Sequence, residues 1–282
     1  MTGGRRPDSL APMQMRDLTG DDLPRAVALS AAVGWNQNEA DWSVFLRDGA
    51  VRAMDDGDPA ILAATAAVLP FGSDLAWISM VLVRPELRRR GLATGLMGWA
   101  IGHLAATRCV ALDASPAGRE VYRRLGFADV FGFTRWRLPA PLRGPERRVR
   151  PLRDTDWPAL LACDAAAFGA PRASLLRGFA ARLPQACWIA EDGSGFVLGR
   201  DGLRTPQIGP VVAEDPATAR ALVAAASRAI GGPALLDLAD EAAALLEDAG
   251  AERLRPFTRM ARGAPPPGIV RRLVAMAGPE FG

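Results

Sequence analysis

The sequence predicts an α/β protein, with a mixed α+β sheet, built from two tandem units of the same fold. The chain of 282 residues has the length of two ordinary domains. A set of residues also recurs in order along its two halves, which indicates an internal duplication. In each half, apolar runs of strand length alternate with helical patterns, as in sheets covered by helices.

Matching residues show the duplication directly. They keep a shift of 134 near the start of each half and of 124 near its end: Arg16, Leu18, Asp22 and Pro24 recur as Arg150, Leu152, Asp156 and Pro158, Leu112-Asp113 recurs as Leu236-Asp237, and Phe133-Thr134-Arg135 recurs as Phe257-Thr258-Arg259. We place the boundary near Pro145. The predicted parts are a flexible arm (1–14), a first domain (15–144) and a second domain with a C-terminal tail (145–282).

The elements follow the same order in both halves. A short strand precedes a helix that opens at an Asp-x-Pro sequence, where Asp can cap and Pro fits the first turn. There follow a second helix, two strands and a buried strand that leads into a helix. A strand, a helix and a last strand complete each half. The predicted ranges are 39–52, 60–69, 75–83 and 109–112 in the first half and 172–183, 187–198 and 234–238 in the second. From Gly263 the tail reads as an extended strap.

Composition excludes several classes of protein. No apolar run approaches the roughly 18 residues of a membrane span, and no apolar segment follows the N-terminal arginines. The three cysteines lack metal spacing and read as reduced core residues, so we expect a cytoplasmic protein without a metal. The net charge is +3, and the arginines are scattered without a basic helix that carries stacking aromatics, which argues against nucleic-acid binding.

The stretch VLVRPELRRRGLATGLMGWA, residues 81–100, predicts an anion site. Pro85 ends a buried strand, and a helical apolar period begins at Leu92. The free N–H groups and the positive dipole end of such a helix attract an anion. Gly91 lets the backbone approach a bulky ligand. The pattern lacks the Gly-Lys-Ser/Thr of a P-loop and the later glycines of the Rossmann fingerprint.

This stretch resembles the pyrophosphate loop of the GCN5-related N-acetyltransferases (GNAT), Arg/Gln-x-x-Gly-x-Gly/Ala after a strand end. A second match, Tyr122 before Leu125-Gly126-Phe127, is similar to the later helix-to-strand signature of that family. The resemblance covers residues 15–138 and implies acetyl-CoA as co-substrate. It implies cofactor contacts from the strand backbone and the loop: Met80, Val81, Leu82, Val83, Arg88, Arg89, Arg90, Gly91, Leu92, Ala93 and Thr94.

The second half departs from the motif. In the middle of each half the shift is 130, as Ile78 and Val81 recur as Ile208 and Val211. This shift places Thr218, Ala221 and Val223 opposite Arg88, Gly91 and Ala93. The later shift of 124 places Leu246 opposite Tyr122. We therefore expect that only the first half binds acetyl-CoA and is catalytic. The second half would be a degenerate copy that shapes the substrate cleft or an interface.

The resemblance implies transfer of an acetyl group to a primary amine of a small molecule by direct attack on the thioester. It also implies that Tyr122 donates to the leaving thiolate. Asp113 is a candidate general base, but Asp237 holds the same place in the copy without the motif, which favours a structural role. Glu39, Asp41 and ordered water remain as alternatives. The loop that borders the acceptor site in this family contributes Trp35, Asn36 and Asn38.

Two other functions stay open. An acyl-CoA-binding regulatory module would need the loop but not Tyr122, and a protein or peptide acetyltransferase would need an open groove. No nucleic-acid or membrane partner is expected. A homodimer is compatible with the sequence.

Overall fold

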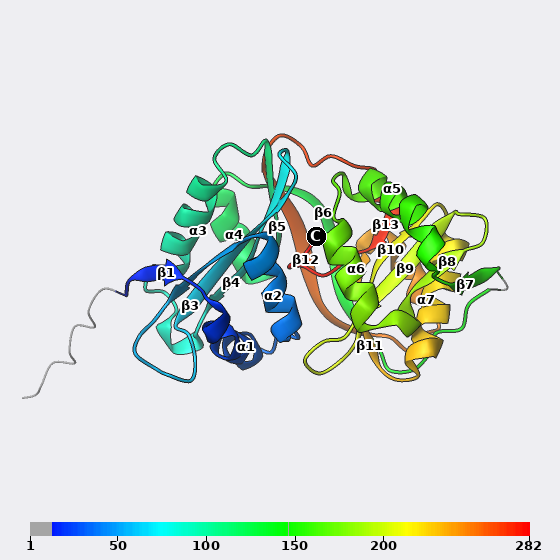
Figure 1. The fold of residues 1–282 in the computed structure, drawn as a ribbon, viewed down its shortest axis with the longest axis horizontal. Helices are drawn as coiled ribbons and strands as arrows, with labels where there is room; N and C mark the ends of the chain where they lie inside the picture. The colour runs from blue at the N-terminus through cyan, green and yellow to red at the C-terminus, as the bar shows by residue number, and fades with distance from the viewer. Residues whose placement is uncertain (1–12, 146) are drawn as a thin grey trace, which may run out of the picture.

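A computed structural model describes residues 13–145 and 147–282 of the chain. The strands form a single sheet of 13 members, with helices packed on it in both halves (Figure 1). This confirms the mixed α/β class. The predicted arm falls mostly on residues 1–12, outside the described residues.

The elements follow the predicted order, with two differences in the second half: the helix between its last two predicted strands is a 3-10 helix (Asp240–Leu246), and the tail adds a further strand. The helices are α1 (Leu23–Ala32), α2 (Glu39–Asp48), α3 (Leu92–His103), α4 (Pro116–Arg124), α5 (Trp157–Phe168), α6 (Ala173–Arg182) and α7 (Pro216–Ile230). The strands are β1 (Met15–Asp17), β2 (Ala50–Met54), β3 (Ala64–Phe71), β4 (Leu75–Val83), β5 (Cys109–Ala114), β6 (Ala128–Leu138), β7 (Val149–Pro151), β8 (Trp188–Ala190), β9 (Gly195–Arg200), β10 (Gln207–Ala213), β11 (Ala234–Ala239), β12 (Glu252–Gly263) and β13 (Leu273–Ala275).

Two predicted ranges of the first half differ from the observed elements. The helix predicted over 39–52 ends at Asp48, and β2 begins at Ala50. Gly49 lies between them. The backbone there passes so close to β3 that a Cβ at position 49 would lie 2.1 Å from the carbonyl oxygen of Val68. The alternation of buried Val51 and Ala53 with Arg52 is that of a strand. The range 60–69 likewise holds one strand, which begins at Ala64.

Several residues that revealed the duplication form the same ion pair in each half. Arg16 donates to Asp22 at 2.6 Å, and Arg150 donates to Asp156 at 2.7 Å. Each pair ties the first strand to the turn that starts the first helix. The side-chain hydrogen bond from Arg150 holds the pKa of Asp156 at about 2. These repeated residues therefore serve the fold.

β6 of the first half and β12 of the second half each pair with strands of the other half. β12 pairs with β5, and β6 pairs with β11, so the central order is β5-β12-β6-β11 (Figure 1). The boundary near Pro145 is thus a boundary in sequence, whereas the two units interlock in space.

A repeated Asp-Arg pair clamps the exchanged strands. Arg259 of β12 lies opposite Asp113 of β5 and donates to both its carboxylate oxygens at 2.9 Å. Arg135 of β6 lies opposite Asp237 of β11 and does the same at 2.7 Å. Bidentate pairs of this kind are strong and geometrically specific. This explains why the Asp and Arg of both copies are retained together.

The C-terminal tail packs between the two halves (Figure 1). The Phe281 ring is fully buried, stacks on Phe45 of α2 at 5.3 Å and meets Phe179 of α6 edge to face at 5.3 Å. Arg172 donates to the carbonyl oxygen of Gly282 at 2.7 Å. The tail therefore packs into a hydrophobic cluster that contains residues of both halves.

Separating the halves is expected to abolish folding. Residues 1–144 alone would expose the edge of β5 and leave buried Asp113 without Arg259, and residues 145–282 alone would lose β6 beside β11. Circular dichroism and gel filtration should show each piece unfolded or aggregated, whereas co-expression should yield a stable one-to-one complex. A monomeric, cooperatively folded single half would contradict the exchanged topology.

Within the described residues, no single helix is both long and apolar enough to cross a membrane, and only the bent pair 154–168 and 173–182 would pass on length and composition together. The same residues hold no group of three or more His, Cys, Asp or Glu side chains placed to bind a metal.

Candidate active site

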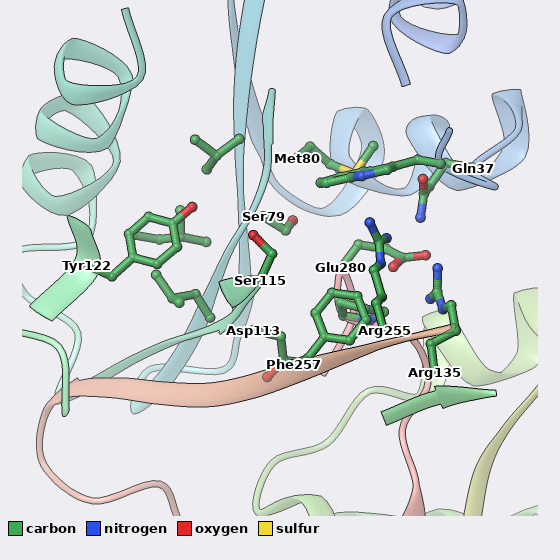
Figure 2. A pocket seen from close by; sticks show the side chains of 15 residues that line it. Gln37, Ser79, Met80, Asp113, Ser115, Tyr122, Arg135, Arg255, Phe257 and Glu280 are labelled. Atoms are coloured by element: carbon green, nitrogen blue, oxygen red, sulfur yellow. The ribbon is translucent and has the colours of Figure 1, made fainter. Parts of the chain in front are cut away.

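A wedge opens between the two parallel strands at the centre of the first half. β4 and β5 pair through Leu75–Trp77 and Cys109–Ala111, and the register stops there. Beyond this point the strands line a cavity that is open to solvent (Figure 2). Ligands of α/β sheets commonly bind beyond the carboxyl ends of parallel strands.

A β-bulge shapes the wall of this cavity. The register of β3 with β4 shifts between Thr65 and Ala67, so Met80 and Val81 together face one residue of β3. Met80 has a left-handed φ of 50°, which is uncommon for a residue with a side chain. The Thr65 hydroxyl donates to the Met80 carbonyl at 2.8 Å and holds this conformation. A bulge of this kind redirects the backbone of the strand at a functional site.

The loop after β4 leads into the N-terminus of α3 with its donors free. Gly91 has a φ of 82° and occupies the N-cap position without a side-chain cap. The first helical bond runs from the Gly95 amide to the Gly91 carbonyl at 3.0 Å. In the described part of the chain, no backbone acceptor pairs with the amides of residues 89–94. The helix start is therefore a ready anion site.

The loop arginines surround this helix start. Arg88, Arg89 and Arg90 are exposed, and none forms an ion pair with a carboxylate of the described residues. Arg84, by contrast, pairs with Asp56 and Asp58 and anchors the loop. The charge of the three exposed arginines is thus available to a phosphate-bearing ligand.

Tyr122 of α4 points into the cavity (Figure 2). Its ring packs against Phe127 at 6.3 Å, and a Cβ on Gly118 would lie 2.9 Å from it, so the residue at 118 must be small. Burial raises the pKa of Tyr122 to about 12. The hydroxyl therefore keeps its proton at neutral pH and can act as a donor.

The opposite end of the cavity is polar and is built largely by the far segments of the chain. Figure 2 shows Gln37, Arg135, Arg255 and Glu280 there, while Ser79 and Ser115 lie between them and Tyr122. The buried Gln37 Oε1 and Ser79 Oγ have no hydrogen-bond partner in the described structure. Unpaired buried polar atoms are costly, and their presence in a cavity indicates a ligand site.

Most of this polar end could not be predicted from the sequence. Gln37 lies within the predicted acceptor loop but carries no motif, and Arg255 and Glu280 are far from the loop in sequence. Only the exchange of β12 and the docking of the tail bring them to the cavity.

The predicted acceptor loop divides into two groups. Trp35 lines the cavity. Asn36 instead donates to the Thr205 carbonyl at 2.7 Å, and Asn38 donates to Asp201 at 3.1 Å. These two amides fasten the loop to the second half.

The candidate bases are also tied into the structure. Both oxygens of Asp113 accept from Arg259, so the carboxylate is occupied although it borders the cavity. Burial raises its pKa and the charge of Arg259 opposes the rise. Asp41 is fully buried between Arg182 and Arg200, at 2.8 and 2.9 Å. The structure thus favours the structural reading of Asp113 that its repeat Asp237 suggested.

In the described part of the second half, a third strand fills the corresponding wedge. β10 and β11 pair only at Gln207–Ile208 and Leu235–Leu236, but β13 inserts beyond this point and pairs with both strands. The bulge of β10 contains Pro210, which has no N–H to donate.

The anion loop is missing there, a larger change than the sequence comparison predicted. Residues 214–215 alone connect β10 to α7, where residues 84–91 connect β4 to α3. Thr218, Ala221 and Val223 lie inside α7 and are buried, so their alignment with the loop was wrong. The Asp215 carboxylate accepts from the amides of Ala217 and Thr218 at 2.9 Å and places negative charge at this helix start.

Comparison with known proteins agrees with this architecture. A model of the acetyltransferase (GNAT) family matches residues 14–127, and a model of an acetyltransferase (GNAT) domain matches residues 160–273. The chain belongs to the GNAT superfamily. It is a tandem member, and the family uses acetyl-CoA as its co-substrate.

Known proteins resemble most or all of the chain. An uncharacterized N-acetyltransferase of Bacillus subtilis, YitH, is 24% identical over 221 residues, which cover 76% of this chain and 77% of that protein. The structure of a candidate acetyltransferase from Pyrococcus horikoshii superposes with a TM-score of 0.82 at 20% identity and covers 100% of both chains. A tandem GNAT protein from the clavulanic acid biosynthesis pathway gives a TM-score of 0.59 at 14% identity, over 90% of this chain and 99% of that one.

Proposed function

We propose that this protein transfers the acetyl group of acetyl-CoA to the primary amine of a small molecule, and that the first half alone does so. The observation that supports this most directly is the open wedge between β4 and β5, which Tyr122 lines. The loop that follows β4 leads to the free amides at the start of α3. The second half supports this division because β13 closes its wedge.

The residues present fit the co-substrate. The amides of residues 89–94 would hold the pyrophosphate, and the exposed Arg88, Arg89 and Arg90 would add charge around it. The edge of β4 beyond Trp77 is not paired with β5 and can bond the pantetheine arm as an added strand. Bound acetyl-CoA supplies the thioester that is attacked.

The chemistry requires two proton movements. The amine nitrogen forms a bond to the acetyl carbon and loses a proton, while the bond from that carbon to sulfur breaks and the thiolate gains a proton. Tyr122 is the donor that faces the cavity, and the backbone at the Met80 bulge lines the place where the oxyanion develops. Holding amine and thioester together supplies much of the rate.

The second half supports a small acceptor over a peptide. Arg255 and Phe257 of β12 and Glu280 of the tail form walls of the cavity (Figure 2). An extended peptide would need an open groove where these residues stand.

Calorimetric titration of the full chain tests the binding part. We expect one acetyl-CoA per chain and a loss of about 10- to 100-fold in affinity for Gly91→Glu, because a carboxylate would enter the anion site. Gly193→Glu is the matched control, since both glycines have positive φ and neither Cβ would meet an atom within 4 Å. Equal effects of the two variants, or two bound molecules, would overturn the assignment.

Release of free thiol during incubation with acetyl-CoA and an amine panel tests turnover. Amine-dependent release supports an enzyme. Binding without any amine-dependent release would favour the regulatory module instead.

A further inference from the structure

Arg255 differs from the other charged residues of the active-site cavity. Asp113 pairs with Arg259, Arg135 with Asp237 and Glu280 with Arg200. Arg255 forms no ion pair and donates no hydrogen bond to any residue that the structure describes. Among the charged side chains that line the cavity, Arg255 alone has no ion-pair or hydrogen-bond partner in the described residues.

Two aromatic rings hold the Arg255 guanidinium in place. Its carbon lies 4.8 Å from the centre of the Phe257 ring and 5.8 Å from that of Trp35. Rings stabilise the cation through their faces and leave the N–H edge free to bind an anion. Burial lowers the pKa of Arg255, and the charge of Arg135 adds to this effect, so an anion beside it would relieve both costs.

Two unpaired polar atoms lie at the same end of the cavity as this guanidinium. The Gln37 side chain is 2% exposed, and its Oε1 has no partner in the described structure. It points to the same end of the cavity as Arg255 and Glu280 (Figure 2). One Glu280 oxygen accepts from Arg200, and no described residue donates to the other.

We propose that the acceptor is an amino acid or a similarly small amine that carries a carboxylate, with the carboxylate bound by Arg255. A planar guanidinium fork matches a carboxylate in shape and charge. The amine would then face Met80 and Ser79 in the middle of the cavity, with Gln37 and Glu280 beside it. This inference rests on the proposed acetyl transfer and names its substrate class.

Matched pairs of amines test the class of acceptor. The full-length protein is assayed by thiol release with α-amino acids and with the amines that lack only their carboxylate. We expect kcat/KM to be at least about 10-fold higher for the amino acid in the preferred pair, since a charged hydrogen-bonded contact is lost without the carboxylate.

Variants then assign the preference to Arg255. Arg255→Gln should lower kcat/KM for the amino acid about 10- to 100-fold and change that of the decarboxylated amine less than about 3-fold. Arg255→Lys should recover part of the loss because it keeps the charge without the fork. Arg253→Gln, an exposed arginine on the same strand, is the control and should change neither value.

The outcomes separate this inference from the proposed function. Equal or better turnover of decarboxylated amines, or an amino-acid preference that survives in Arg255→Gln, overturns the carboxylate site while leaving the acetyltransferase intact. Failure of every amino acid to be acetylated or to bind calorimetrically in the presence of coenzyme A also overturns it. Loss of acetyl-CoA binding by the unaltered protein would instead overturn the proposed function.

Discussion

Replacing Tyr122 with phenylalanine is expected to lower kcat about 100-fold, within the range for removal of a general acid. The substitution keeps the ring that packs against Phe127 and deletes only the hydroxyl that faces the cavity. The KM for acetyl-CoA and the free energy of unfolding should therefore change little. Steady-state kinetics over amine and acetyl-CoA concentrations would separate these effects.

The ionisation of Tyr122 can be followed directly because the chain contains a single tyrosine. Spectrophotometric titration should place its pKa at about 12, above the ordinary tyrosine value of 10.0. The donor form then persists through any neutral or mildly alkaline assay, so kcat should show no decline from this group near pH 9. An unchanged kcat in Tyr122→Phe would remove the hydroxyl from the reaction.

Replacing Arg200 with methionine is expected to lower the free energy of unfolding by about 3–5 kcal/mol. Arg200 is fully buried, donates to Asp41 at 2.9 Å and Gln207 at 3.1 Å, and also pairs with Glu280. Methionine would leave the buried Glu280 carboxylate without a counter-charge. Urea denaturation of the full chain measures the loss.

Two further variants identify the cause of this loss. Arg147→Met removes an exposed arginine that pairs with Asp215 at 3.3 Å and should cost less than about 1 kcal/mol. Adding Glu280→Gln to Arg200→Met should recover part of the stability because the uncompensated charge is gone. A double variant no more stable than the single one would mean that lost packing against Phe179 and Phe281 dominates.

Much of the first half of the site follows from local sequence. The strand from Leu75 to Val83 and the helix from Leu92 were both predicted and are confirmed. Three local signals predict these elements: an apolar β-branched run, a proline that ends it and a glycine before a helical period. Each acts over a few residues, so its effect can be predicted without the rest of the chain.

The roles of repeated residues were harder to predict. The recurrence of Asp113 as Asp237 and of Arg135 as Arg259 was visible, but each Asp pairs with the Arg of the other copy. A sequence pattern carries no sign of which strand will lie beside another. The alignment of the second half was wrong at the loop for a related reason. The connection between β10 and α7 is much shorter than that between β4 and α3, so the positions aligned with the loop lie inside α7.

By itself, the sequence determined that this protein is a tandem α/β chain whose first half has a glycine-led helix start after its central strand, because strand ends and helix starts depend on local order. Tertiary structure alone decided that β6 and β12 change places, that β13 closes the second wedge and that the tail reaches the cavity. Those features arise from pairing between distant segments. Gln37, Arg255 and Glu280 meet only because the sheet and the tail bring them together.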